Sequence, residues 1–145
     1  MKITRMDHIG IVVNDLEAAK EFFIDFGLVM DGEGGLEGEL LDNVAGLKHA
    51  KTQFVWLRPP DGGTALEIIK FLAPAGEQAE QAYPSNALGI RHISFAVQDI
   101  DALVAKLRSK GVEFFSEIQN YQDIYKLCYL RGPEGMIVEI AEELK

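Results

Sequence analysis

A tandem duplication restricts the fold of this chain more than any other feature of its sequence. The stretch from Met6 to Met30 aligns without a gap with the stretch from Ile90 to Phe114, each residue matching the one 84 positions later. Six of the 25 aligned pairs are identical, namely His8/His92, Ile9/Ile93, Val13/Val97, Asp15/Asp99, Ala18/Ala102 and Gly27/Gly111. Such a chain is expected to fold as two copies of one structural unit.

Each copy opens with the pattern of a strand, a helix and a second strand. The segments HIGIVV and HISFAV are typical of strands and run into Asp15 or Asp99, a residue type that caps the first turn of a helix. An amphipathic stretch follows and ends at Gly27 or Gly111, which supplies the left-handed residue that closes a helix.

The second halves of the copies repeat as well. LRPPDG and LRGPEG each precede a short apolar run, ALEII or IVEI, and Pro-Asp-Gly and Pro-Glu-Gly predict hairpin turns between strands. The repeated unit is therefore βαβββ, and the fold class is α+β. We expect a single domain over residues 1–145, with the first module in residues 1–72 and the second in residues 89–145. Residues 73–88 are interpreted as a linker, and residues 31–50 as a glycine-rich loop with a short helical turn at DNVAGL.

Composition excludes several classes of protein. No apolar run approaches the roughly 20 residues that span a bilayer, and the start of the chain lacks the pattern of a secretory signal, so no membrane partner and a cytoplasmic location are expected. Cys128 is the only cysteine, which excludes an intrachain disulfide and fits a reducing compartment. The 14 basic and 23 acidic residues give a net charge of −9 without a basic cluster, so nucleic acid is not expected as a partner.

Two glutamates lie in strands where a charge is unfavourable. The period of two places Glu67 on one face with Ile69, and Glu139 on one face with Ile137. A carboxylate among apolar neighbours is costly unless it is paired, hydrogen-bonded or bound to a metal. Taken singly, each glutamate has a simpler explanation as part of an exposed strand edge.

Histidines precede these glutamates at equivalent positions of the two copies. His8 shares its face with Gly10, and His92 with Ser94, so small neighbours leave room beside each imidazole. Packing of the two modules about a pseudo-twofold axis would bring both histidines and both glutamates together as a metal site. Two imidazoles and two carboxylates suit Zn, Ni, Co, Mn or Fe(II), and the absence of thiolate disfavours a closed structural zinc site.

These residues resemble the vicinal oxygen chelate superfamily, which contains glyoxalase I, methylmalonyl-CoA epimerase, extradiol dioxygenases, fosfomycin-resistance enzymes and bleomycin-binding proteins. The resemblance covers nearly the whole chain and is strongest in DHIGIVVNDLEAAKEFF, ALEII, RHISFAVQDIDALVAKLRSKGV and LRGPEGMIVEI. It implies paired βαβββ modules that form an incomplete barrel around a divalent metal. The implied ligands are His8, Glu67, His92 and Glu139.

The subclasses of that superfamily differ in their ligands. Bleomycin-binding members lack the ligand set, and extradiol dioxygenases use two histidines and one carboxylate, which would leave one glutamate surplus here. The pattern is most similar to glyoxalase I and related isomerases. There the metal chelates two neighbouring oxygens of a small substrate and stabilises the enediolate formed by proton abstraction next to a carbonyl. The resemblance thus implies a metal-dependent lyase or isomerase with Glu139 or Glu67 as the base.

Two positions depart from the pattern of bacterial glyoxalase I. That enzyme has an Arg four residues after the first histidine and an Asn four residues after the first glutamate, both serving glutathione, whereas this chain has Val12 and Phe71. A methylmalonyl-CoA epimerase-like isomerase, an Fe(II) extradiol-type dioxygenase and a non-catalytic small-molecule binding protein remain alternatives. No convergent basic patch for CoA phosphates is evident. Helix faces and sheet edges suggest a homodimer, with the modules pairing within one chain or between two.

Several aromatic residues are candidates for the substrate pocket, although aromatic residues on strands are more often part of the core. The candidates are Phe54, Trp56, Phe71, Tyr121 and Tyr125. Glutamates of the glycine-rich loop, Glu33, Glu37 and Glu39, are alternative mobile bases, although such a charged loop is more often only solvated.

Overall fold

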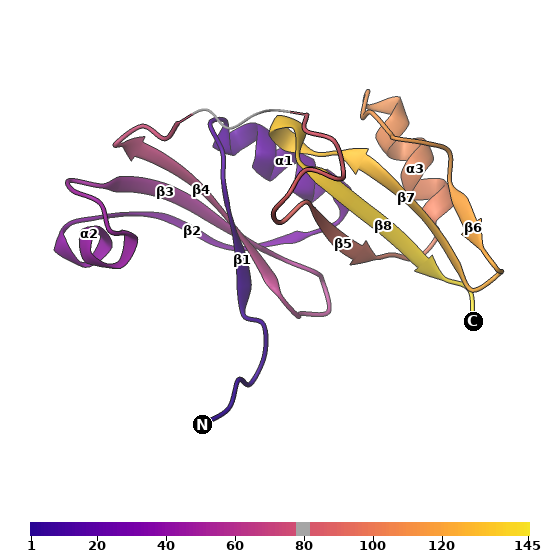
Figure 1. The fold of residues 1–145 in the computed structure, drawn as a ribbon, viewed down its shortest axis with the longest axis horizontal. Helices are drawn as coiled ribbons and strands as arrows, with labels where there is room; N and C mark the ends of the chain where they lie inside the picture. The colour runs from indigo at the N-terminus through magenta and orange to yellow at the C-terminus, as the bar shows by residue number, and fades with distance from the viewer. Residues whose placement is uncertain (78–81) are drawn as a thin grey trace. The chain divides into compact units, whose positions relative to one another are not determined.

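The computed structural model describes residues 1–77 and 82–145, and the chain divides into two compact units, Met1–Gln78 and Ala79–Lys145. Each unit contains one four-stranded sheet, drawn from indigo to magenta for the first unit and from orange to yellow for the second (Figure 1). The α+β class and the two βαβββ modules are confirmed. Residues 78–81, in the middle of the predicted linker, lie outside the described residues. No helix in the described ranges is long and apolar enough to cross a membrane.

The first unit has the sheet order β1-β4-β3-β2. Strand β1 pairs with β4 in parallel, whereas β4 pairs with β3 and β3 with β2 in antiparallel orientation. The elements of this unit are β1 (His8–Val12), α1 (Leu16–Phe26), β2 (Val29–Glu37), α2 (Glu39–Ala45), β3 (Lys51–Arg58) and β4 (Ala65–Ala73).

The second unit repeats this topology with the order β5-β8-β7-β6. Strand β5 pairs with β8 in parallel, and the other two pairings are antiparallel. Its elements are β5 (His92–Ala96), α3 (Ile100–Ser109), β6 (Gln119–Tyr121), β7 (Tyr125–Arg131), a 3-10 turn (Pro133–Gly135) and β8 (Ile137–Glu143). In both units the histidine-bearing strand lies at the edge of the sheet, beside the strand that carries the glutamate.

Helices α1 and α3 begin and end as the repeat predicts. The side chains of Asp15 and Asp99 accept hydrogen bonds from the backbone N–H groups of Ala18 and Ala102, at 3.0 and 3.1 Å. Gly27 follows α1 with a φ of 126°, a conformation that residues with a side chain rarely adopt. The caps at Asp15 and Asp99 set the residue at which each helix begins after the strand that carries the histidine.

Both predicted hairpin turns are present, and equivalent arginines hold them. Arg58 donates a hydrogen bond to the carbonyl of Gly63 at 3.1 Å, and Arg131 donates one to the carbonyl of Gly135 at 3.0 Å. The turns fix the register of β3 on β4 and of β7 on β8, so each glutamate faces a defined partner across the sheet.

One face of each sheet forms the core of its unit. In the first unit, residues such as Val55, Leu57 and Ile68 are almost completely buried, and α1 packs on β3 and β4 through buried residues that include Phe23. The residues that alternate with these lie on the opposite face, which carries the histidine and the glutamate.

The prediction of a glycine-rich loop after α1 is wrong for residues 31–37, which belong to strand β2. Strand β2 extends to Glu37 and pairs with β3 throughout, apart from one irregularity between Met30 and Gly32. A Cβ atom on Gly34 would lie 3.2 Å from Cζ of Phe54, so the aromatic ring packs closely over the glycine on β2. Cross-strand pairing therefore outweighs the low strand propensity of glycine. A short helix, α2, follows where a helical turn was expected.

Candidate metal centre

The second unit brings its predicted histidine and glutamate into direct contact. His92 begins β5, and Glu139 lies on β8 opposite Ser94, so both side chains project from the same face of adjacent strands. Nε2 of His92 lies 3.3 Å from Oε2 of Glu139. The Glu139 side chain is 17% exposed, in keeping with a carboxylate held among apolar neighbours.

The separation of these two atoms suits joint coordination of one ion. Donor atoms that each lie about 2.1 Å from a divalent metal, at angles between octahedral and tetrahedral values, are roughly 3.0–3.4 Å apart. The observed 3.3 Å falls in this range. The residues present therefore fit the group that the resemblance implies.

In the second unit an aromatic residue lies beside the pair formed by His92 and Glu139. Tyr129 on β7 lies directly opposite Glu139. Its ring centroid is 5.0 Å from that of His92, so the tyrosine packs against the imidazole. Packing of this kind limits the rotation of the histidine and helps to hold it toward the glutamate.

The first unit reproduces this arrangement in its backbone register. His8 begins β1, and Glu67 on β4 lies opposite Gly10 on one side and Trp56 on the other. The rings of His8 and Trp56 meet edge to face with centroids 4.7 Å apart. Each unit thus contributes one histidine, one glutamate and one aromatic residue at equivalent positions.

The two histidines differ in what surrounds them. Nδ1 of His8 lies 2.9 Å from Oδ2 of Asp7, which also forms an ion pair with Arg5. Hydrogen bonds from His8 and Arg5 hold the pKa of the Asp7 carboxyl below its usual range, so this group is a carboxylate at neutral pH. A histidine that donates through Nδ1 keeps the lone pair of Nε2 for a metal. At the equivalent position before His92, the chain has Arg91.

Neither unit is sufficient for a four-ligand site. Within each unit, the described residues contain no group of three or more His, Cys, Asp or Glu side chains placed to bind one ion. Each unit contains two of the four residues predicted as ligands, His8 and Glu67 in the first and His92 and Glu139 in the second.

The predicted pocket residues occupy different environments. Trp56 contacts His8, whereas Phe54 lies across Gly34, and Phe71 on β4 is opposite Thr52. In the second unit Tyr121 borders a cavity, and Tyr125, the first residue of β7, lies opposite Tyr121.

Tyr129 was missed by the sequence analysis, although the repeat could have identified it. It precedes LRGPEG just as Trp56 precedes LRPPDG, so the two aromatic residues are equivalent. The glutamates of the glycine-rich segment, which were considered as alternative bases, do not lie on a loop as predicted. Glu33 and Glu37 belong to β2, and Glu39 begins α2, so none of them lies on a mobile loop.

Two modules of this topology, each with a histidine on its edge strand and a glutamate on the neighbouring strand, define the class of vicinal oxygen chelate folds. The sequence profile described as "Glyoxalase/Bleomycin resistance protein/Dioxygenase superfamily" matches residues 5–140. The chain therefore belongs to this superfamily.

Relatives and solved structures agree with this assignment. The chain is 26% identical over 142 residues to the uncharacterized protein YaeR of Escherichia coli (strain K12), covering 97% of this chain and 98% of that protein. A crystal structure of a glyoxalase family protein from Bacillus cereus is 38% identical, with a TM-score of 0.95 and coverage of 100% and 97%.

A more distant structure shares the fold. Glyoxalase I of Leishmania major, described as trypanothione-dependent, is 22% identical with a TM-score of 0.66, covering 97% of this chain and 88% of that one.

Proposed function

We propose that this protein is a divalent-metal-dependent lyase or isomerase that abstracts a proton next to a metal-chelated carbonyl of a small substrate. His8, Glu67, His92 and Glu139 would hold the ion. The observation that carries the proposal is the 3.3 Å contact between His92 and Glu139, with the same residue types at the same register positions in the first unit. The metal-bound fosfomycin-resistance protein FosX of Listeria monocytogenes, in a structure with Mn(II), shares the fold at a TM-score of 0.61 and 17% identity, covering 97% of this chain and 93% of that one.

A bound divalent ion would withdraw electron density from a chelated carbonyl and so make the adjacent C–H bond more acidic. Glu139, or Glu67 at the equivalent position of the first unit, would detach from the ion and supply the proton acceptor: its carboxylate takes the proton from carbon and returns it to the neighbouring atom of the substrate. No external oxidant or reductant is consumed in such a transfer.

The four ligands come from two modules, which belong to one chain or to the two chains of a homodimer. Loss of metal on dilution to monomer would indicate the second arrangement, and its retention the first. Sedimentation velocity with metal analysis of each species distinguishes them. The proposal for the reaction holds in either case.

Exchange of a substrate proton with solvent tests the reaction without knowledge of the natural substrate. Metal-loaded protein is incubated with hydroxyacetone in D₂O, and loss of the proton signals next to the carbonyl is followed by NMR. We expect Glu139→Gln to slow the exchange by about 100-fold or more, as for removal of a general base. Glu143→Gln, an exposed glutamate on the same strand, is the matched control. Exchange by Glu139→Gln at the wild-type rate would remove Glu139 as the base.

A further inference from the structure

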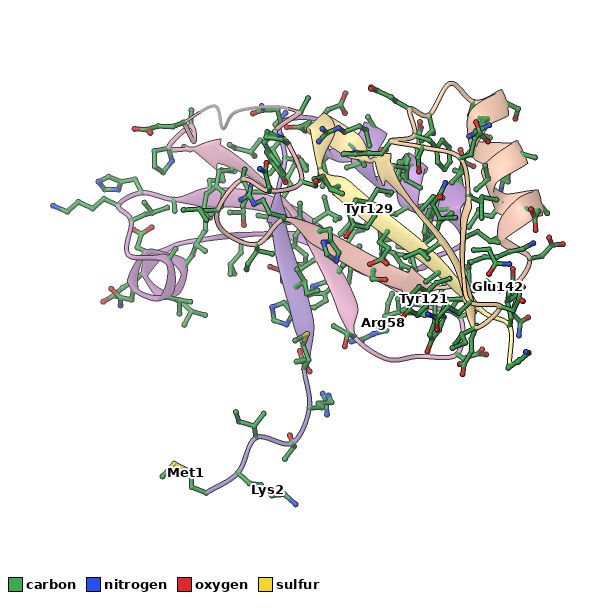
Figure 2. All side chains as sticks on the ribbon, turned by 45° about the vertical axis from the view of Figure 1, so that its right-hand side comes forward. Met1, Lys2, Arg58, Tyr121, Tyr129 and Glu142 are labelled. Carbon is green, nitrogen blue, oxygen red and sulfur yellow. The ribbon has the colours of Figure 1, made fainter. Side chains whose placement is uncertain are left out.

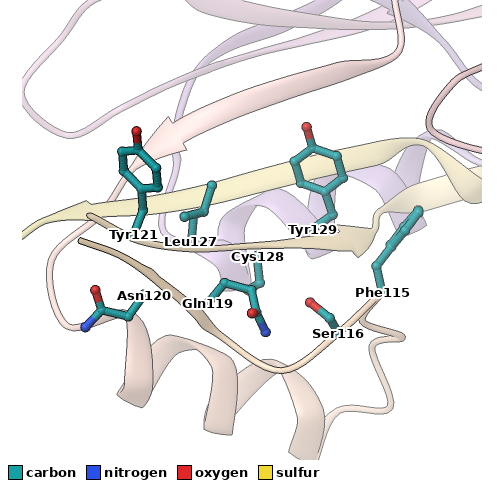
Figure 3. Close-up of a pocket in the computed structure, with 8 residues that line it drawn as sticks. All are labelled: Phe115, Ser116, Gln119, Asn120, Tyr121, Leu127, Cys128 and Tyr129. Atoms are coloured by element: carbon teal, nitrogen blue, oxygen red, sulfur yellow. The ribbon is translucent and has the colours of Figure 1, made fainter. Parts of the chain in front are cut away.

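A cavity opens in the second unit where the chain before β6 leaves β7. The N–H of Phe115 donates to the carbonyl of Tyr129 at 3.0 Å, and pairing resumes only at Gln119, opposite Leu127. The intervening segment bends away from the strand and leaves a volume of about 310 Å³ (Figure 3). The residues that line it are Phe115, Ser116, Gln119, Asn120, Tyr121, Leu127, Cys128 and Tyr129.

No residue that lines this cavity carries a charge at neutral pH. None is Asp, Glu, Lys, Arg or His, although such residues are common in the chain, and burial raises the pKa of the Cys128 thiol so that it remains protonated. A highly charged ligand group, such as the phosphates of a coenzyme, would find no counter-ion among the residues that line the cavity.

The polar side chains of the cavity are already engaged with nearby groups. Ser116 and the amide nitrogen of Gln119 both donate to the carbonyl of Glu117, at 2.8 and 3.0 Å. Asn120 donates to the Asp123 carboxylate and accepts from the Asp123 N–H, each at 2.9 Å. What these walls offer to a ligand is mainly apolar and aromatic surface.

The cavity adjoins the half-site of the second unit. Tyr129 lines it and also packs on His92, with ring centroids 5.0 Å apart. Tyr121, Leu127 and Tyr129 point to the same side in the close-up (Figure 3), and the register of β7 on β8 places Tyr129 beside Glu139. Tyr129 is therefore shared by the lining of the cavity and the surroundings of His92 and Glu139.

From these observations we infer that the cavity between Phe115 and Tyr129 binds an uncharged apolar substituent, an aryl or short alkyl group, of the metal-chelated substrate. This inference rests on the proposed function for the chelating end of the substrate. It specifies a small substrate with neighbouring oxygens at one end and a hydrophobic group at the other.

Two 2-hydroxy acids with the same chelating end test the selectivity. Mandelate carries a phenyl group where lactate carries a methyl group, and the binding of each to metal-loaded protein is measured by calorimetry. We expect mandelate to bind about tenfold or more tightly, because the ring leaves water for the cavity. Leu127→Trp, which fills the cavity, should abolish this preference, and Leu40→Trp, at an exposed leucine of α2, should keep it.

A metal-free experiment separates failure of this inference from failure of the proposed function. Benzyl alcohol, which has no second oxygen for chelation, is titrated into the metal-free protein while amide NMR signals are followed. We expect saturable shifts at Ser116, Gln119 and Cys128 that Leu127→Trp removes. Tyr121→Ala, at the exposed rim, should weaken these shifts in a folded protein even if Leu127→Trp does not fold.

The outcomes are distinct. Absence of saturable shifts at these amides, or equal affinity of mandelate and lactate in metal-loaded protein, would overturn the cavity as the binding site. Failure of the protein to take up a divalent metal would refute the proposed function, while benzyl alcohol would still report on the cavity.

Discussion

Replacement of Asp7 by Asn tests whether this carboxylate positions His8 as a metal ligand. Oδ2 of Asp7 lies 2.9 Å from Nδ1 of His8, and the variant replaces a charged acceptor with a neutral amide of nearly the same shape. Loss of a partner of this kind lowers metal affinity by roughly 10–100-fold in known sites. Because the Asp7 side chain is 52% exposed and water competes for the imidazole, we expect the lower end of that range, about tenfold.

Competition with a chromophoric chelator measures the metal affinity of this variant. Asp61→Asn, at an exposed aspartate in the turn between β3 and β4, makes the same change of charge in the same unit and should leave the affinity unchanged.

The tautomer of His8 provides a readout that does not depend on metal. Long-range proton–nitrogen NMR of the metal-free protein should show the wild-type imidazole protonated at Nδ1, and a larger share of the other tautomer in Asp7→Asn. The residues that precede Asp7 extend away from the sheet, as Met1 and Lys2 show (Figure 2), so the substitution disturbs no packed core. Unchanged tautomer populations together with unchanged metal affinity would refute the positioning role of Asp7.

Three further predictions concern the scaffold. Gly34→Val should lower the free energy of unfolding by about 1–3 kcal/mol, measured by urea denaturation, because its side chain meets the Phe54 ring; an unchanged midpoint would contradict the close approach. Glu142→Ala should cost about 1–2 kcal/mol, because Glu142 accepts hydrogen bonds from two backbone N–H groups at the start of α3; an equal loss from Glu142→Gln would be unexpected. The hydrogen bond to Asp101 raises the pKa of Lys126, so the contribution of this pair to stability is complete below pH 10.5 and disappears as the pH rises through the raised pKa. Lys126→Met should therefore be destabilising at pH 8 but not at a pH above the raised pKa.

The sequence was sufficient to predict the repeated topology because the relevant signals are local. Asp15 and Asp99 cap helices through side-chain oxygens three residues from their donors, and the Pro-Asp-Gly and Pro-Glu-Gly turns form between adjacent strands. Period-two alternation also predicted that Glu67 and Glu139 share a face with apolar residues. Short-range chemistry of this kind depends little on the rest of the chain.

The course of β2 could not be predicted by the same reasoning. Four glycines and four acidic residues between Asp31 and Glu39 indicate a loop when each residue is judged by its own propensity. What makes this segment a strand is its partner β3, some twenty residues later, and the Phe54 ring that packs closely over Gly34. Such pairing over a distance has no local signal.

The contact between His92 and Glu139 illustrates an intermediate case. The repeat identified both residues, but their 3.3 Å separation follows from the parallel pairing of β5 with β8, which sets Glu139 opposite Ser94. The role of Tyr129 follows from the antiparallel pairing of β7 with β8. The residue types were therefore predictable, whereas the geometry required the sheet.

The two copies of the repeat differ in how completely the outermost strand of the sheet pairs with its neighbour. In the first unit, β2 stays paired with β3 from Gly32 to Glu37. In the second unit, pairing with β7 is interrupted between Phe115 and Gln119, and the cavity beside Tyr129 lies at this interruption. Duplication places a histidine and a glutamate at equivalent register positions of both units, but the proposed substrate, with two different ends, needs surroundings that differ. The interrupted pairing lies between β6 and β7, at one end of the sheet order. The histidine and the glutamate lie on β5 and β8, at the other end, so the interruption provides this difference without moving either residue.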